Sequence, residues 1–233
     1  MTADDLKLLR QFTRAGDQLA FTTLIQRHVN LVYSAALRQV RSPHLAEEVA
    51  QSVFTDLARD AAKLKPDTIL TAWLYEVARR TAIDVVRKES RRQLREQIAV
   101  ELNTMNATAQ SSAGVPPAWS DIEAHLDDAM AALNQTDRTA LLLRYFENKS
   151  LAEIGLALGT SDDAAQKRVS RAIDQLRNFF TQRKVTIGAS GLVVLITANA
   201  VQAAPAGLAA TIATVTLAGT AVTTSTAKYA SAA

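Results

Sequence analysis

Cysteine is absent from this 233-residue chain, and histidine, glycine and proline are scarce. Without thiols the chain can form neither a disulfide framework nor a thiolate metal site, which fits a reducing cytoplasm. The three histidines, His28, His44 and His125, have no partners at ligand spacing, so we expect no metal and no cofactor. Because there are only eight glycines and five prolines, and no alternating strand pattern before the tail, the composition predicts an all-α fold.

The usual sequence signatures of catalysis are also missing. The chain has no glycine-rich phosphate loop and no Ser/His/Asp set at a recognised spacing. The sequence therefore favours a protein that acts by binding rather than an enzyme.

Positive charge is concentrated in two stretches, although the net charge is only +3. Arg79–Arg92 holds six Lys or Arg against two Asp or Glu, and Lys167–Lys184 holds six against one. Clustered cations of this kind are the electrostatic footprint of nucleic-acid binding.

Residues 151–180 have the pattern of a helix-turn-helix. Leu151–Leu158 is a short apolar helix that ends at Gly159, a residue that tolerates a left-handed turn, and Ser161 is placed to cap the next helix. An apolar stripe on that second helix predicts packing: Ala165, Val169, Ala172, Leu176 and Phe180. The opposite face carries Lys167, Ser170, Arg171 and Asn178. This geometry suits a major groove, and the alternative is an ordinary solvated helix with a basic face.

A second cationic face is predicted on a long helix over about residues 68–92. Its packing side carries Leu74, Ala78, Thr81 and Val85. The other side carries a row with a single acidic member, Arg80, Asp84, Arg87 and Arg91, with Lys88 beside it. Such a row can neutralise the phosphates of a strand whose bases are displaced. Trp73 precedes the row, and we favour a core position for it over base stacking.

The remaining pattern predicts two small helical domains. Helices are expected at 4–15, at 17–40, from the cap Ser42-Pro43 onward, at 122–133, and at 138–146 behind a Thr136-Asp137 cap. Small polar residues and Val-Pro-Pro in the stretch 103–120 are typical of a linker. We therefore predict a first domain at 1–95, a linker at 96–121, a second domain at 122–182 and a C-terminal extension at 183–233.

The C-terminal extension contains an uncharged run of 43 residues, from Val185 to Ala227. The segment 187–204 is only marginally long enough to span a bilayer, and Asn199 and Gln202 oppose insertion. Three interpretations stay open: a membrane helix, a hairpin in or through the membrane, and an apolar flap folded on the two domains. Because Arg183-Lys184 precedes the run, we favour a cytoplasmic protein tethered to the membrane through residues 185–227.

Four segments, in this order, resemble those of a sigma factor of the extracytoplasmic-function type, the minimal two-domain members of the sigma-70 family. LAEEVAQSVFTDLAR (45–59) is similar to the helix that docks on the polymerase clamp, and WLYEVARRTAIDVVRKESRR (73–92) to the segment that recognises and opens the −10 element. LNQTDRTALLLRYFENKSLAEIGLALG (133–159) is similar to the start of the −35 domain, and SDDAAQKRVSRAIDQLR (161–177) to its recognition helix.

The resemblance implies a protein that binds core RNA polymerase, directs it to promoter DNA and helps to open the duplex, with an anti-sigma factor as a possible further partner. It implies polymerase contacts for Glu47, Glu48 and Gln51. It implies −10 contacts for Arg80, Asp84, Arg87, Lys88 and Arg91. It implies −35 contacts for Lys167, Arg168, Ser170 and Arg171.

Four positions depart from the family pattern. Arg80 stands where Asn is common, so the base preference at that position cannot be transferred. Asp162, Asp163 and Gln166 replace small residues and a frequent cation; the two aspartates suit a helix start but not a phosphate contact.

Two other classes of protein remain as alternatives. One is a helix-turn-helix regulator that acts without core polymerase, and the other is a membrane-anchored interaction protein. A regulator needs neither the acidic segment 45–59 nor a second nucleic-acid face at 80–91, and this chain has both.

Overall fold

The computed structural model describes residues 3–100 and 119–218, and every element within these ranges is helical. The first helical group comprises α1 (Ala3–Ala15), α2 (Gln18–Val40), α3 (Pro43–Asp60), the short η1 (Ala61–Lys63) and α4 (Leu70–Val100). The second helical group comprises α5 (Trp119–Ala132), α6 (Gln135–Leu141), the π-helical turn η2 (Leu142–Phe146), α7 (Leu151–Leu158) and α8 (Asp162–Gln182). The tail adds α9 (Ala189–Asn199) and a further helix over residues 208–218. The predicted all-α fold is confirmed.

Helix ends follow the predicted capping chemistry with one exception. Ser42 caps α3 through its side chain, as predicted, and the Asp17 side chain caps α2. The predicted Thr136-Asp137 cap is wrong, because Asn134 caps α6 by accepting a hydrogen bond from the Asp137 amide at 2.9 Å. At the predicted linker 96–121, α4 continues to Val100 and α5 begins at Trp119, while residues 101–118 lie outside the described part.

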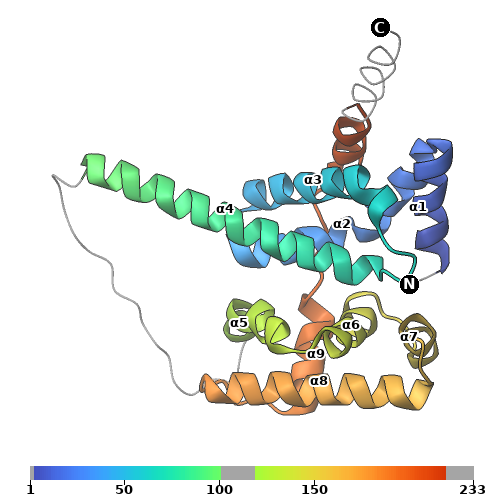
Figure 1. Cartoon of the computed structure of the whole chain (residues 1–233). Coiled ribbons are helices and arrows are strands. Elements are labelled where there is room, and N and C mark those ends of the chain that lie inside the picture. Colours follow the sequence, from blue (N-terminus) through green and yellow to red (C-terminus); the bar gives the residue numbers. More distant parts are fainter. Residues whose placement is uncertain (1–2, 101–118, 219–233) are drawn as a thin grey trace, which may run out of the picture.

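The two helical groups form two stacked layers, with α1–α4 above and α5–α8 below in Figure 1. A single apolar cluster runs through both layers and into the tail, from Phe21 and Leu57 to Leu126, Leu176 and Ile196, all of them inaccessible to solvent. Burial of this continuous surface stabilises one joined body rather than two separate ones.

A buried carboxylate, Asp127 on α5, joins the two layers. Its two oxygens receive hydrogen bonds from Arg38 Nε at 3.0 Å and Arg38 Nη2 at 3.1 Å. Tyr75 Oη donates to the same carboxylate at 2.6 Å, and Gln39 Nε2 at 3.1 Å. Burial raises the pKa of Asp127, but the Arg38 guanidinium and these donors more than offset it, so the net pKa is lowered. Asp127 is therefore ionised and fully partnered at neutral pH.

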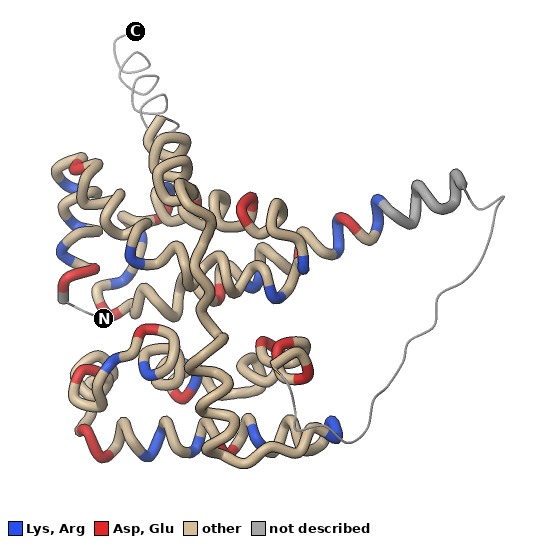
Figure 2. The backbone as a smooth tube through the Cα atoms, turned by 180° about the vertical axis from the view of Figure 1, so that it is seen from behind, with Lys and Arg blue, Asp and Glu red and all other residues tan. Residues whose placement is uncertain are grey.

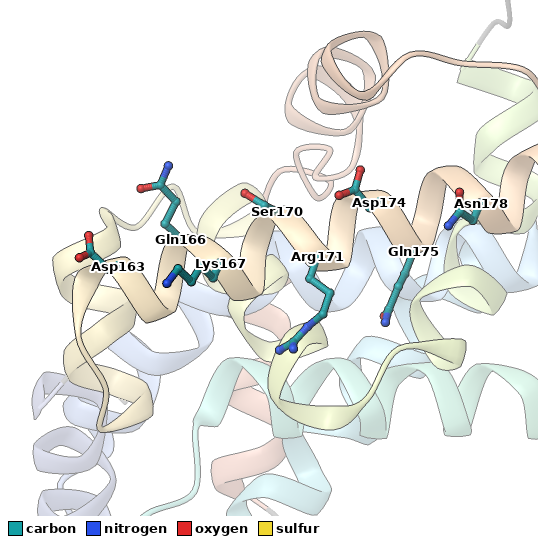
Figure 3. Close-up of a pocket in the computed structure, with 8 residues that line it drawn as sticks. All are labelled: Asp163, Gln166, Lys167, Ser170, Arg171, Asp174, Gln175 and Asn178. Carbon is teal, nitrogen blue, oxygen red and sulfur yellow. The ribbon is translucent and has the colours of Figure 1, made fainter.

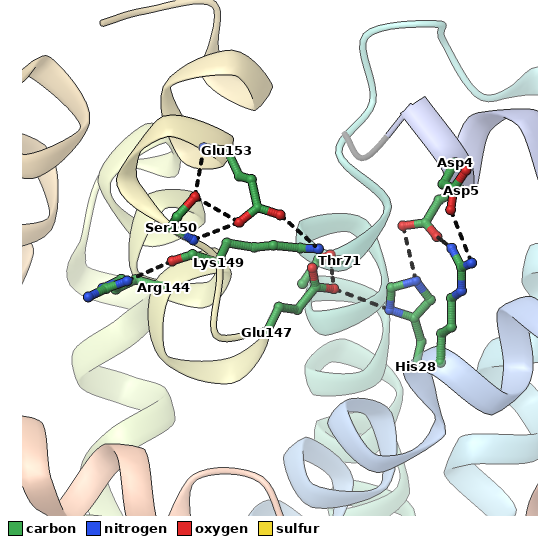
Figure 4. Close-up of polar contacts among 10 residues, drawn as sticks. Asp4, Asp5, His28, Thr71, Arg144, Glu147, Lys149, Ser150 and Glu153 are labelled. Atoms are coloured by element: carbon green, nitrogen blue, oxygen red, sulfur yellow. Dashed lines mark hydrogen bonds and ion pairs between the residues drawn. The ribbon is translucent and has the colours of Figure 1, made fainter. Parts of the chain in front are cut away.

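A second buried charge, His28 on α2, lies between carboxylates of the two layers (Figure 4). Its Nε2 is 3.3 Å from Asp5 Oδ2 in α1, and its Nδ1 is 3.4 Å from Glu147 Oε1, just after η2. Thr71 at the start of α4 also donates a hydrogen bond to Glu147. Burial lowers the pKa of His28, but the two carboxylates outweigh burial and raise it to about 9.

The tail packs on both layers in the structure. Figure 2, seen from behind, shows it as an uncharged stretch that runs from the lower layer to the upper one. α9 contacts α8 and η2, and Ile187, Leu192, Ile196 and Ile212 of the tail are buried in the common core.

Across residues 3–100 and 119–218 no helix is both long and apolar enough to cross a membrane. The expected membrane helix is therefore not found in the described part of the tail, which instead adopts the third interpretation, an apolar flap on the two helical groups. The physical reason is that Asn199 to Pro205 interrupt the run, leaving two short helices whose apolar side chains, among them Leu192, Ile196 and Ile212, are buried in the common core.

We predict a pH-dependent contribution of His28 to stability. Because its folded pKa lies above the ordinary 6.5, its contribution is complete below about pH 6.5 and is lost as pH rises through about 9. The free energy of unfolding in urea should fall by on the order of 3 kcal/mol over this interval in the wild type. His28→Gln should remove most of this dependence, whereas exposed His44→Gln should retain it. An unchanged pH profile in His28→Gln would contradict the assignment.

Candidate nucleic-acid interface

α4 presents the predicted cationic row to solvent. Leu74, Ala78 and Ala82 are buried in the core, which fixes the rotation of the helix. The five predicted −10 residues are all exposed: Arg80, Asp84, Arg87, Lys88 and Arg91. Asp84 Oδ1 is 3.7 Å from Arg87 Nη1, and both side chains are about two-thirds exposed, so this contact leaves the guanidinium accessible to a phosphate.

Trp73, two turns before the row, is half-buried and packs against the core. It lines a hollow of about 430 Å³ between α4 and α6 together with Glu76 and Arg138, which form an ion pair at 2.8 Å. The favoured interpretation of Trp73 as a packing residue agrees with this placement.

The helix-turn-helix has a tight and well-capped geometry. Ser150 and Glu153 form a reciprocal capping box at the start of α7, and Ser161 accepts a hydrogen bond from the Ala164 amide at the start of α8. Gly159 adopts φ +63°, as predicted. Gly155 is required as well, because a Cβ there would lie 2.8 Å from the Thr160 carbonyl oxygen. These two glycines let α7 approach α8 closely.

The outer face of α8 forms a shallow polar groove of about 570 Å³ (Figure 3). It is lined by Asp163, Gln166, Lys167, Ser170, Arg171, Asp174, Gln175 and Asn178. Lys167 and Ser170, two of the predicted −35 residues, therefore lie on the open face. Gln166, which replaces a cation frequent in the family, also lies on the open face. Its side-chain amide is of the type that reads base edges.

The two predicted arginines of α8 instead reach back to α6. Arg171 donates from Nε to Asp137 Oδ2 at 2.7 Å and from Nη2 to Oδ1 at 2.8 Å, and Arg168 Nη1 lies 3.4 Å from Oδ1. Asp137 is inaccessible to solvent. Burial raises the pKa of Asp137, but Arg171 and the other donors lower it overall. In the free protein these arginines orient α8, a role that helical spacing cannot show because Asp137 is more than 30 residues away.

The predicted polymerase contacts lie on α3. Glu48 is exposed and its Oε1 is 3.3 Å from His44 Nδ1. Glu47 and Gln51 are half-buried, and burial, together with the nearby charge of Glu47, raises the pKa of Tyr33. Glu48 faces solvent and Glu47 is partly covered, while Ala46, Val49 and Ala50 pack inward.

No cluster of three or more His, Asp or Glu suited to a metal occurs in the part of the chain that the structure describes.

Two family models match the chain in order. The model described as Sigma-70 region 2 matches residues 24–92, and that described as Sigma-70, region 4 matches residues 124–176. The first match ends at residue 92 and so includes the exposed row of α4. The second match includes the helix-turn-helix.

Curated relatives are similar over most of the chain. RNA polymerase sigma factor CarQ of Myxococcus xanthus is 31% identical over 75% of this chain and 97% of its own length. ECF RNA polymerase sigma factor SigK of Mycobacterium tuberculosis is 26% identical over 76% and 94%. Probable RNA polymerase sigma factor RfaY of Xanthomonas campestris is 30% identical over 85% of this chain and 51% of the relative.

A solved structure of the sigma factor RpoE from Bartonella quintana, in complex with the anti-sigma factor NepR, is 18% identical. It covers 66% of this chain and 92% of its own, with a TM-score of 0.30.

We predict opposite phenotypes for two cations of α8. Lys167→Ala should leave stability unchanged and weaken binding to duplex DNA, with the salt slope reduced by about 1. Arg171→Ala should lower the urea midpoint, because it removes the bidentate partner of buried Asp137. Titration of labelled duplex at several salt concentrations, together with urea unfolding, separates the two. Equal urea midpoints for Arg171→Ala and wild type would contradict the structural role.

Proposed function

The chain belongs to the sigma-70 family, as a sigma factor of the extracytoplasmic-function type that directs transcription initiation by core RNA polymerase, and from this premise we propose how its surfaces divide the work. The observation that carries the proposal is that the two exposed polar helix faces, on α4 and on α8, fall within the region 2 and region 4 matches respectively. We also propose the domain limits 1–95 and 122–182, joined by the linker 96–121.

The exposed row of α4 is our proposed −10 reader. Its cations lie on one side of a helix whose other side is held in the core, so they can meet a phosphate backbone without local refolding. Arg87 and Lys88 stabilise the strand that leaves the duplex, and Asp84 restrains Arg87 in the free protein. Opening follows if the displaced strand binds this row more tightly than the duplex does.

The outer face of α8 is our proposed −35 reader, with its N-terminal half in the major groove. Lys167 and Ser170 make the first contacts, because they lie on the open face. Arg168 and Arg171 contribute in a second way, by fixing α8 on Asp137, and the half-exposed Arg171 can extend a hydrogen bond to DNA at the edge of the groove.

The acidic face of α3 is our proposed docking surface for core polymerase, through Glu47, Glu48 and Gln51. We infer that the protein works by binding alone, without a catalytic step, in the cytoplasm where polymerase and chromosome meet. An anti-sigma factor remains a proposed partner.

Run-off transcription tests the function directly. Core polymerase with a promoter library should yield discrete transcripts only when this protein is added. Glu47→Lys combined with Glu48→Lys should abolish those transcripts, because both carboxylates of the docking surface reverse sign. Exposed Asp128→Lys on α5 serves as the control and should transcribe normally. Full transcription by the double variant, with its helical content unchanged, would refute the α3 assignment.

A defect in opening is expected for Arg87→Ala. Closed-complex formation should stay measurable, since the other cations of the row and the α8 face remain. Permanganate reactivity of unpaired thymines near the start site should fall severalfold. Arg10→Ala, an exposed cation on α1, is the matched control. Wild-type reactivity in Arg87→Ala would count against the row as the −10 reader.

A further inference from the structure

The tail bridges the two helical groups, contacting the second group with its first part and the first group with its later parts. Its first part, α9, contacts α8 and η2 of the second group. Its middle part, residues 200–204, follows α2, and its last described helix, over residues 208–218, approaches α3 of the first group. Figure 2 shows this path from one layer to the other. The tail therefore ties together the two halves that carry the proposed promoter contacts.

α2 holds the middle part through the tail's main chain. Asn30, Ser34 and Arg38 recur one turn apart on one side of α2. Arg38 Nη1 donates to the Ala200 carbonyl at 2.7 Å, and Ser34 both donates to the Gln202 carbonyl at 3.1 Å and accepts from the Gln202 amide at 2.7 Å. The Ala204 amide donates to Asn30 Oδ1 at 3.0 Å. These hydrogen bonds, called here the α2 ladder, hold residues 200–204 as an extended segment in a defined register. The contact is therefore specific and does not rest on apolar burial alone.

The last described helix lies beside the proposed polymerase surface. Thr216 is 2% exposed, and its Oγ1 is 3.5 Å from Thr55 Oγ1 on α3. Thr55 stands one turn after Gln51 and donates a hydrogen bond to the Gln51 carbonyl at 2.8 Å. A partner that covers the α3 face around Gln51 therefore meets the tail helix at its edge.

The joined body is too small to reach both promoter elements at once. The centres of the −10 and −35 elements are about 25 base pairs apart, which is about 85 Å along the duplex. α4 packs on α6 and α6 on α8, so the axes of α4 and α8 lie about 20 Å apart. The 21-residue α8 itself is only about 32 Å long. The two groups must separate before both faces engage one promoter.

We propose that residues 187–218 form a cis-acting strap that holds the two helical groups closed and must leave α2 and α3 before core polymerase and both promoter elements are bound. The inference rests on the proposed function for its −10, −35 and polymerase faces. α9 stays on α8, while the α2 ladder and the Thr55 contact are the part that releases. Docking of the strap and docking of core polymerase then compete, and the closed fraction lowers the apparent affinity for polymerase.

A reversible crosslink tests the strap in the full chain. Because the chain has no cysteine, Thr55→Cys with Thr216→Cys introduces one defined pair at the contact between α3 and the tail. In the oxidised form, run-off transcription should fall by about tenfold or more, and dithiothreitol should restore it in the same sample. Thr55→Cys alone, treated with the same oxidant, is the matched control. Equal transcription by the verified disulfide form and the reduced form overturns the strap.

Failure of the strap is distinguishable from failure of the proposed function. If the reduced pair and the wild type both direct no transcription, the function is refuted. If both transcribe and oxidation changes nothing, only the strap is refuted.

A gain in affinity provides a second test that misfolding cannot imitate. Gln202→Pro removes the amide that donates to Ser34, so the strap should loosen and affinity for core polymerase should rise severalfold. Ala203→Pro is the matched control, because the Ala203 amide has no hydrogen bond within the described residues and its side chain is exposed. Equal polymerase affinity in Gln202→Pro and Ala203→Pro overturns the proposal.

Discussion

The buried ion pair between Arg38 and Asp127 is the constraint on which the closed arrangement depends. Both side chains are almost completely removed from water, and a charge in that position is tolerated only when every partner is present. Those partners come from different parts of the chain: Tyr75 from α4, Asp127 from α5, and the Ala200 carbonyl from the tail. Removal of Arg38 or Asp127 alone leaves the other charge buried and unpaired, which costs about 3–5 kcal/mol. The two helical groups and the tail are therefore coupled into one cooperative unit.

The buried charges between the two helical groups also allow the groups to separate. Arg38, Asp127, His28 and Glu147 regain hydration when the layers separate, so opening does not expose only apolar surface. A joint between such layers suits a sigma factor, which has to hold two DNA-reading faces on one chain and then place them far apart on a promoter. The proposed strap is consistent with such opening. Its contacts with α2 are hydrogen bonds between α2 side chains and the main chain of the tail, which water can replace.

Local sequence signals predicted the helices well and the long-range contacts poorly. The bounds of α7, the turn at Gly159 and the Ser161 cap follow from residue types a few positions apart. Arg171 was placed correctly on the outer side of α8, but no spacing reveals that its side chain returns to Asp137. The cap of α6 was misplaced because Asn134, Thr136 and Asp137 are all capable caps, and only the fold shows that Asp137 serves the arginines. The tail was interpreted as a membrane segment because an apolar run does not show which apolar surface covers it, lipid or protein.

The separation of the two helical groups is the most direct measure of this account. In the cysteine-free chain, dyes attached at Gln26→Cys on α2 and Ala152→Cys on α7, both exposed, report it by energy transfer. The account predicts high transfer in the free protein and a large drop when core polymerase and promoter DNA bind. High transfer that persists in an actively transcribing complex, or low transfer in the free protein, would contradict it.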